Sequence, residues 1–303
     1  MGIGLLYGFG INFFRLTRLL VADPESQGVH MLHQGISIML APVLLLQGLN
    51  VRRTTPKLAE PEGERLGQTG TNPELSVLIL GDSAAAGVGV ANQDQALLGQ
   101  VVHYLRPHGH LKYGLFAKTG ATTSTTLESL NDHINCSHPI LGQGHFDIII
   151  TSLGVNDITS SLSCDKWLQQ QAQLLTLITE RYTPKLILVT AIPPLGSFPA
   201  LPNPLRWSLG QRAKHFNHKL QQLLLMLDQQ ALDQQQIDQQ QIDKQSKAQT
   251  RFTLINLPLE NPQQDSSMVD FMRQVMATDG FHPGPQIYTA WAKLIAEQIQ
   301  LRK

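Results

Sequence analysis

The chain has 303 residues, enough for one large domain or two small ones, and 42% of them are hydrophobic, so it can bury a substantial core. Its 23 basic and 23 acidic residues cancel, which argues against a nucleic-acid-binding protein because such proteins carry an excess of positive charge. Two cysteines, Cys136 and Cys164, are too few for a disulfide framework and have no CxxC spacing for zinc. We expect two unbonded thiols, with a single bridge as the alternative.

Two apolar stretches lie near the N-terminus, at residues 3–14 and, more strongly apolar, at residues 35–49. Both are shorter than the roughly 20 apolar residues that span a bilayer comfortably. We nevertheless expect residues 1–53 to associate with a membrane, with contact through residues 35–49. Arg52, Arg53 and Lys57 follow that stretch, and the positive-inside rule then favours the cytoplasmic face for the rest of the chain. An apolar helix packed on the globular domain, an extracytoplasmic location and a start at Met31 are alternatives that the sequence leaves open.

Residues 54–74 are rich in Pro, Gly, Thr and Glu, a composition typical of a linker, so we predict a domain from residue 75 to residue 303. Within this domain, residues 228–249 contain LDQQQ, IDQQQ and IDKQS in succession. Such low-complexity sequence indicates a mobile insertion or a solvated helix extension without a catalytic role.

From residue 75 onward, short apolar runs alternate with helical patterns. The predicted strands cover residues 75–80, 113–117, 146–153, 186–192 and 252–257, and the predicted helices cover residues 95–105, 123–134, 166–182, 205–227 and 285–301. This alternation predicts an α/β fold in which a five-stranded parallel sheet lies between two layers of helices. Uninterrupted apolar runs such as residues 148–150 fit strands that are covered on both faces.

Residues suited to hydrolytic chemistry follow four of these strands, and in a parallel sheet the carboxyl ends of the strands lie at the same edge. Ser83 follows the first strand in the motif GDS, Gly120 follows the second, and Asn156 follows the third. Asp279 and His282 come after the fifth strand. Each residue taken singly has an ordinary explanation as a helix cap or a turn residue. Together at one edge, they are the parts of a serine hydrolase site.

The four blocks GDS, an isolated glycine, GVND and DGFHP resemble those of the GDSL, or SGNH, hydrolases. The resemblance covers the chain from about residue 75 to the C-terminus and implies a flavodoxin-like three-layer α/β/α fold. It implies that Ser83 is the nucleophile, His282 the general base and acid, and Asp279 the third member of a triad. It also implies an oxyanion hole made of the backbone N–H groups of Ser83 and Gly120 and the side chain of Asn156. The first block reads GDSA where many members have GDSL, a difference at a packing position.

The chemistry of these side chains agrees with those roles. A serine hydroxyl becomes a good nucleophile when a base takes its proton, and the unperturbed pKa of histidine, near 6.5, suits His282 to that task. Asp279 lies three residues upstream and can reach the other ring nitrogen. We expect Asp82, beside Ser83, to orient the turn rather than to be the triad acid.

The sequence therefore predicts an esterase that cleaves carboxylic esters through an acyl-enzyme, with no cofactor and no metal. A short acyl or acetyl ester, a lysophospholipid and a thioester remain candidate substrates. Acyl transfer by the same triad and a catalytically silent membrane-associated binding module are the alternatives. The chain lacks the GxSxG elbow of the α/β-hydrolases and the GxxxxGK[ST] of a P-loop. In the proline-rich stretch 193–205 and just beyond it, Phe198, Leu201 or Trp207 is predicted to line the substrate pocket.

Overall fold

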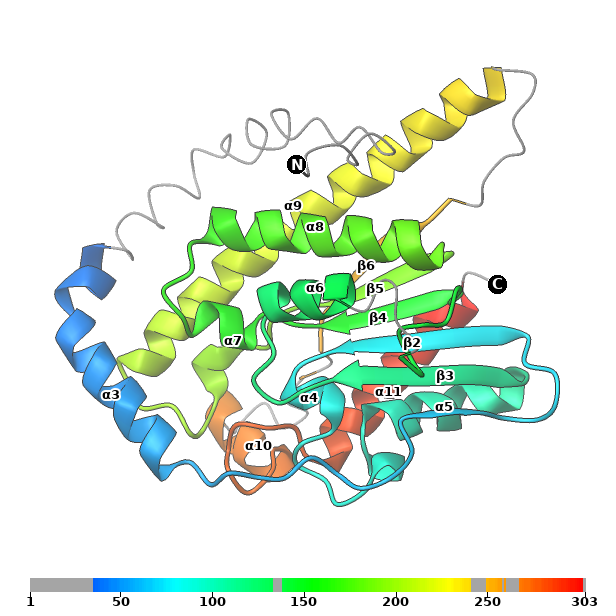
Figure 1. The fold of residues 1–303 in the computed structure, drawn as a ribbon. Coiled ribbons are helices and arrows are strands. Elements are labelled where there is room, and N and C mark those ends of the chain that lie inside the picture. Colours follow the sequence, from blue (N-terminus) through cyan, green and yellow to red (C-terminus); the bar gives the residue numbers. More distant parts are fainter. Residues whose placement is uncertain (1–34, 133–137, 241–248, 258, 260–266, 302–303) are drawn as a thin grey trace.

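A computed structural model describes residues 35–132, 138–240, 249–257, 259 and 267–301, with only the backbone for residues 234–240 (Figure 1). A six-stranded sheet runs through the middle of the molecule in the order β1-β3-β2-β4-β5-β6. The strands are β1 (Leu66–Gln68), β2 (Leu75–Gly81), β3 (Leu111–Ala117), β4 (Ile148–Ser152), β5 (Leu186–Thr190) and β6 (Arg251–Ile255). All neighbouring pairs are parallel except β1 and β3. The five predicted parallel strands are therefore present.

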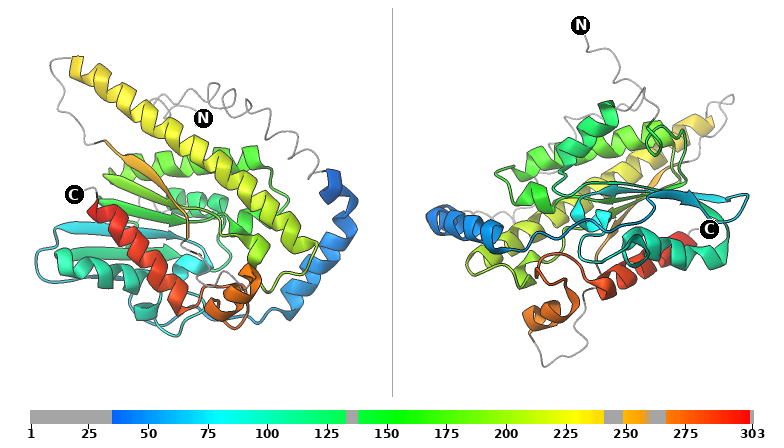
Figure 2. Two further views of the ribbon diagram at one scale, coloured as in Figure 1. Left: turned by 180° about the vertical axis from the view of Figure 1, so that it is seen from behind. Right: turned by 60° about the horizontal axis from the view of Figure 1, so that its bottom comes forward.

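Helices cover both faces of the sheet, which gives the three-layer α/β/α architecture (Figure 2). One layer contains α5 (Leu97–Leu105) and α11 (Pro285–Gln300), and the other contains α6 (Thr123–Asp132), α8 (Cys164–Tyr182) and α9 (Leu205–Gln240). Alternate side chains of β4 point toward opposite helix layers. Ile148 and Ile150 pack with α5 and α11, whereas Ile149 packs with α8 and α9. This double coverage explains why the strands are apolar without interruption.

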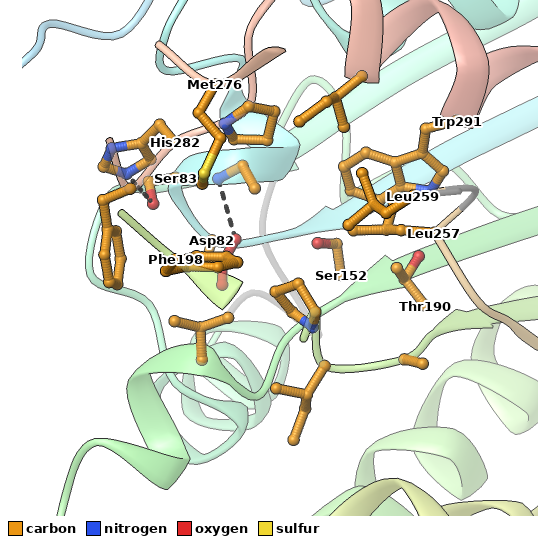
Figure 3. Close-up of a pocket in the computed structure, with 18 of the residues that line it drawn as sticks. Asp82, Ser83, Ser152, Thr190, Phe198, Leu257, Leu259, Met276, His282 and Trp291 are labelled. Carbon is orange, nitrogen blue, oxygen red and sulfur yellow. Dashed lines mark hydrogen bonds between the residues drawn. The ribbon is translucent and has the colours of Figure 1, made fainter. Parts of the chain in front are cut away.

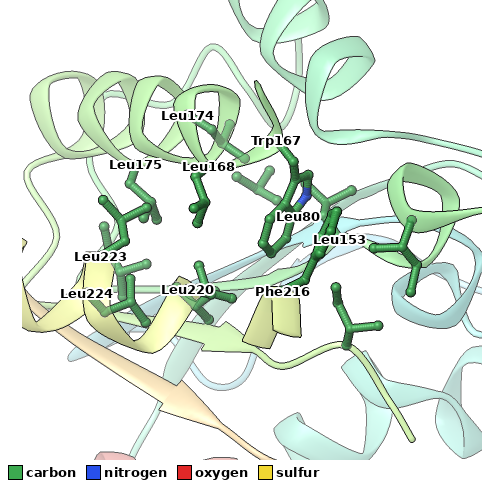
Figure 4. Packing of buried hydrophobic residues seen from close by; sticks show 14 of the residues in the cluster. Leu80, Leu153, Trp167, Leu168, Leu174, Leu175, Phe216, Leu220, Leu223 and Leu224 are labelled. Atoms are coloured by element: carbon green, nitrogen blue, oxygen red, sulfur yellow. The ribbon is translucent and has the colours of Figure 1, made fainter. Parts of the chain in front are cut away.

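The larger core lies where α8 and α9 pack on the sheet (Figure 4). Trp167 of α8 and Phe216 of α9 meet with ring centroids 5.0 Å apart, and Leu220, Leu223 and Leu224 continue the apolar face of α9. The core thus fixes the carboxyl ends of the central strands, from which the loops with the predicted site residues depart.

The sheet has a sixth strand that the sequence did not predict. β1 lies inside residues 54–74, the predicted linker, and pairs antiparallel with β3, with Leu66 opposite Gly114. Only one of its three residues is strongly apolar, so its formation depends on the free edge that β3 offers and not on its own pattern. The same segment is tied to the domain by Glu60, which accepts hydrogen bonds from the Thr119 N–H at 2.7 Å and from Arg65 at 2.6 Å. These contacts hold residues 60–68, a part of the predicted linker, against the domain.

Helix α3 (Ala41–Thr54) lies beside the start of α9, on the side of the molecule toward which β2, β3 and β4 point (Figure 1). The side chain of Gln47 donates to the Asn203 carbonyl at 2.7 Å and accepts from the Leu205 N–H at 3.0 Å. Leu44 and Val51 pack against the core. Within the described part of the chain, no helix has both the length and the apolarity that a bilayer crossing needs. The first apolar stretch, residues 3–14, lies outside the described residues.

Helix α9 continues well beyond its predicted end at residue 227, through the first Gln/Asp repeats to Gln240. Asp228, at the start of the repeats, accepts a hydrogen bond from the Phe252 N–H at 2.8 Å and so ties α9 to β6. Residues 241–248 of the predicted insertion lie outside the described part, as does Cys136. Cys164 is a free thiol, and burial raises its pKa to about 12.

Candidate active site

Ser83 sits at the tight turn between β2 and the short helix α4 (Ser83–Ala86). The side chain of Asp82 caps this helix by accepting a hydrogen bond from the Ala84 N–H at 3.0 Å. Gly81 ends the strand where a Cβ atom would come within 2.5 Å of the Ser152 carbonyl oxygen, so a larger residue cannot stand there. The turn thus places the Ser83 hydroxyl at the carboxyl edge of the sheet.

His282 and Asp279 come from the loop before α11. His282 meets Ser83 at the same edge of the sheet although it lies 199 residues later in the sequence. The Nε2 atom of His282 lies 2.9 Å from the Ser83 hydroxyl oxygen, and its Nδ1 atom lies 2.5 Å from the Asp279 carboxylate. The other carboxylate oxygen of Asp279 accepts the backbone N–H groups of Phe281 and His282, each at 2.9 Å. A continuous chain of hydrogen bonds therefore joins the aspartate, the imidazole and the serine.

The two aspartates near Ser83 differ in their electrostatics. Burial raises the pKa of Asp279, but hydrogen bonds from the His282 ring and from the backbone outweigh it and hold that pKa below its usual value. Burial raises the pKa of Asp82 to about 6, since its Ala84 hydrogen bond and the nearby His282 offset only part of the desolvation. Asp279 is therefore the carboxylate that stays charged beside the imidazole.

Gly120 and Asn156 face each other across the loops that follow β3 and β4. Asn156 lies in the short helix α7 (Val155–Ile158), and its side-chain amide donates to the Ala121 carbonyl at 2.8 Å. Gly120 has φ +82°, a conformation that favours glycine, and an added Cβ would meet no atom within 4 Å. An amide NH₂ carries two hydrogens, so Asn156 retains one donor beyond the bond that fixes it to the Gly120 loop.

Asp157, the last residue of the GVND block, belongs to this site although the sequence assigned it no catalytic role. It is buried, and both of its carboxylate oxygens accept from the Thr123 N–H, at 3.1 and 3.2 Å. Gln171 of α8 in turn donates to the Thr123 hydroxyl at 2.9 Å. Asp157 thus anchors the end of the loop that carries Gly120. In the sequence, the only signal was an acidic residue directly after Asn156.

Residues 79–290, more than half of the chain, match the model of the GDSL-like Lipase/Acylhydrolase family. The chain belongs to this family. As a GDSL-like hydrolase it is a carboxylic ester hydrolase, as the sequence predicted. A search of the curated proteins found no match.

Solved structures similar to this GDSL-like hydrolase include an esterase from Pseudoalteromonas sp., at 16% identity, with 75% of this chain and 98% of that chain covered and a TM-score of 0.47. A lipase/acylhydrolase from Enterococcus faecalis is 15% identical, with 75% and 96% covered and a TM-score of 0.46. A lipolytic G-D-S-L protein from Veillonella parvula is 10% identical, with 76% and 100% covered and a TM-score of 0.49.

A cavity of about 630 Å³, counting the part open to solvent, adjoins Ser83 and His282 in this GDSL-like hydrolase (Figure 3). Phe198 lines it, as predicted from the proline-rich loop. Leu201 and Trp207 do not: Leu201 is buried in the core, and Trp207 lies at the surface of α9 with 36% of its area exposed. Asp82, Ser152, Thr190 and, from α11, Ile287 and Trp291 also line it. Among the described residues, no group of three His, Cys, Asp or Glu side chains could hold a metal ion.

Proposed function

We propose that the protein hydrolyses carboxylic esters through an acyl-enzyme on Ser83, with His282 as general base and acid and Asp279 as the third member of the triad. The observation that carries this proposal is the chain of hydrogen bonds from Asp279 through His282 to Ser83. An inactive binding module does not require a serine hydroxyl, an imidazole and a charged carboxylate that are connected by hydrogen bonds. This geometry therefore supports an active enzyme.

In the first half-reaction, Nε2 of His282 takes the hydroxyl proton of Ser83 while the serine oxygen attacks the carbonyl carbon of the ester. The carbonyl oxygen becomes negative, and the backbone N–H groups of Ser83 and Gly120 and the amide of Asn156 donate to it. The bond to the alcohol oxygen then breaks, and the imidazolium gives its proton to the departing alcohol. In the second half-reaction, a water molecule replaces the alcohol, and the same transfers release the acid and restore Ser83.

Asp279 has two tasks in this scheme. Its carboxylate holds the Nδ1–H tautomer of His282, which leaves Nε2 as the acceptor for the serine proton. Its negative charge also stabilises the imidazolium formed in each half-reaction. The lowered pKa of Asp279 supports this role because it favours the ionised carboxylate beside the imidazole.

Transfer of the acyl group to a sugar or another alcohol uses the same residues, because the second half-reaction only requires a hydroxyl in place of water. We propose water as the acceptor. Analysis of products formed with competing alcohols separates the two reactions, since a transferase would make new ester in preference to free acid.

The test of the hydrolase proposal uses the full chain, p-nitrophenyl acetate and a fluorophosphonate label. We expect ester cleavage and covalent labelling of Ser83, and loss of both in Ser83→Ala. Ser129→Ala is the matched control, because among the residues that the structure describes this hydroxyl on α6 bonds only to the Thr125 carbonyl of its own helix. A folded wild-type protein that neither cleaves the ester nor takes up the label would refute the proposal.

We also propose that α3 contacts a lipid surface that carries negative charge, on the cytoplasmic face. Its outer side exposes Leu45, Leu46 and Leu49 by 68%, 69% and 58%, and Ile38 and Met39, in the helical residues that precede it, are exposed as well. Arg52 and Arg53 end the helix and are exposed, so a cationic end adjoins the apolar face. An apolar face with adjacent basic residues is the pattern that interfacial helices present to anionic lipids.

Co-sedimentation with vesicles of phosphatidylglycerol and phosphatidylcholine tests this contact. We expect the full chain to bind these vesicles better than vesicles of phosphatidylcholine alone, and L45S/L46S to lose most of the binding. Leu225→Ser is the control because Leu225 is equally exposed, at 63%, but lies on α9. Equal recovery of wild type and L45S/L46S with the vesicles would contradict the proposal.

A further inference from the structure

Gly120 occupies the third position of a four-residue turn that follows β3. The turn is closed by a hydrogen bond of 3.0 Å from the Ala121 N–H to the Lys118 carbonyl. Gly120 has φ +82° whereas the φ of Thr119 is negative, which makes this a type II turn. Because an added Cβ at Gly120 would meet no atom within 4 Å, the position needs glycine for its backbone conformation and not for lack of space.

The type of this turn decides where the Gly120 N–H points. That N–H belongs to the peptide between Thr119 and Gly120, which is the central peptide of the turn. Type I and type II turns differ by a flip of this peptide, and a glycine can adopt both. A flip would direct the N–H away from the position in which it can donate to the oxyanion. A turn that is held in type II therefore keeps this donor oriented before the substrate arrives.

Separate side chains hold the residues on either side of Gly120. On one side, the amide of Asn156 donates to the Ala121 carbonyl at 2.8 Å. On the other side, one carboxylate oxygen of Glu60 accepts both the N–H and the hydroxyl of Thr119, each at 2.7 Å. Hydrogen bonds to a charged acceptor are stronger than those between neutral groups. Thr119 is therefore fixed through its backbone and its side chain at once.

Glu60 is fixed in turn by Arg65. The guanidinium donates to the other carboxylate oxygen of Glu60 at 2.6 Å and to the carbonyl of Ala117, the last residue of β3, at 3.0 Å. Burial raises the pKa of Glu60, but the hydrogen bonds from Thr119 and Arg65 outweigh it and hold that pKa below its usual value. A charged carboxylate, itself attached to the end of β3, thus stands beside the turn.

We propose that Glu60 is a positioning residue of the oxyanion hole, which holds the peptide between Thr119 and Gly120 in the orientation that the reaction needs. This inference rests on the proposed ester hydrolysis and adds to it a residue that acts through Thr119 and not on the substrate. Glu60 lies upstream of residues 79–290, which match the family model, so the motifs of the site do not include it. The segment that precedes the parallel sheet therefore contributes to the rate of the reaction.

Steady-state kinetics of the full chain with p-nitrophenyl acetate tests this role. Glu60→Ala removes both bonds to Thr119 and should lower kcat about 5- to 30-fold, with a change in KM of less than about twofold. The loss should be smaller than the roughly 10²- to 10³-fold that a missing oxyanion donor costs, because Asn156 and Asp157 still hold the loop. Both half-reactions pass through an oxyanion, so kcat reports the effect whichever of them is slower.

Glu60→Gln is the conservative variant, because its amide oxygen can still accept from Thr119, and it should restore kcat to within about threefold of wild type. Glu64→Ala is the matched control, since Glu64 is exposed in the same segment, and it should leave kcat unchanged.

A double-mutant cycle with Gly120→Ala separates positioning from a merely structural role. An alanine disfavours the positive φ of this position, so Gly120→Ala alone already displaces the donor. In that background Glu60→Ala should lower kcat by less than about twofold, because two changes that act through the same peptide are not additive. An equal loss with and without Gly120→Ala would overturn the inference.

Urea denaturation shows whether each variant is folded. If Glu60→Ala does not fold, Thr119→Val takes its place, because it removes only the hydroxyl bond to Glu60 and should lower kcat about two- to fivefold. A folded Glu60→Ala, or Thr119→Val in its place, with the kcat of wild type would overturn this inference alone. A folded wild type that cleaves no ester would instead count against the proposed hydrolysis.

Discussion

Asp82 and Asp279 are both buried next to the serine–histidine pair, yet their surroundings shift their pKa values in opposite directions. Asp82 receives a backbone hydrogen bond within the turn after β2 and remains costly to ionise. Asp279 receives two backbone N–H groups and the imidazole, and these donors hold it in the charged form. Proximity to Ser83 in the sequence therefore does not identify the triad acid. The contact with the imidazole separates the two carboxylates: Asp279 lies 2.5 Å from Nδ1 of His282, whereas Asp82 caps α4.

The largest effect in this comparison is expected from Asp279→Asn. The amide keeps the shape of the side chain but removes the charge and favours the wrong tautomer of His282, so kcat should fall about 10³- to 10⁴-fold. Steady-state kinetics with p-nitrophenyl acetate measures this loss. Asp270→Asn, on the exposed face of α10 (Met268–Val275), is the control. A decrease of less than tenfold would show that Asp279 is not the triad acid.

A smaller effect is expected from Asp157→Ala, which removes the acceptor of the Thr123 N–H and loosens the loop that carries Gly120. A misplaced oxyanion donor should lower kcat by up to about 10²-fold and change KM little. Asp157→Asn retains one acceptor oxygen and should restore most of kcat. If Asp157→Ala instead raised KM and left kcat intact, the residue would not act by positioning the loop.

The smallest effect on activity is expected from Asp82→Asn, whose amide oxygen can still cap α4, and kcat should fall less than about tenfold. The Asp82→Asn substitution should instead change the pH dependence of the free energy of unfolding. The pKa of Asp82 is raised from 3.8 in its unperturbed state to about 6. Asp82 should therefore lower the unfolding free energy of the wild type by about 3 kcal/mol as the pH rises from 3.8 to about 6. In this pH range the unfolded chain has released the Asp82 proton while the folded chain still holds it.

Urea denaturation of wild type and Asp82→Asn at several pH values measures this contribution. The variant should gain stability over the wild type as the pH rises from about 4 to about 6, and the difference should be constant above that interval. A difference that does not vary with pH would mean that Asp82 titrates normally in the folded protein.

The sequence predicted the central sheet and the residues that meet at its edge, for physical reasons that can be stated. Strands covered on both faces must be apolar throughout, and β4 with Ile148, Ile149 and Ile150 shows this directly. Because the carboxyl ends of parallel strands share one edge, Ser83, Asn156 and His282 could be placed together without any knowledge of side-chain positions.

The features that the sequence did not predict depend on contacts between distant parts of the chain. β1 has little strand character of its own and forms because β3 offers an edge. The cavity is assembled from the ends of β4 and β5, from α10 and from α11, so no local pattern marks its walls. For the same reason the sequence could not decide among Phe198, Leu201 and Trp207 as lining residues.

The bond between Glu60 and Thr119 has a practical consequence for shortened versions of the protein. Glu60 accepts both the backbone N–H and the hydroxyl of Thr119, each at 2.7 Å, and Thr119 directly precedes Gly120. A fragment that begins at residue 70 would lack Glu60, Arg65 and β1. It would leave the edge of β3 unpaired and would remove the Glu60 contact that, together with Asn156 and Asp157, holds the Gly120 loop. The smallest fragment that preserves the catalytic edge must therefore begin before residue 60, well upstream of the first strand of the parallel sheet.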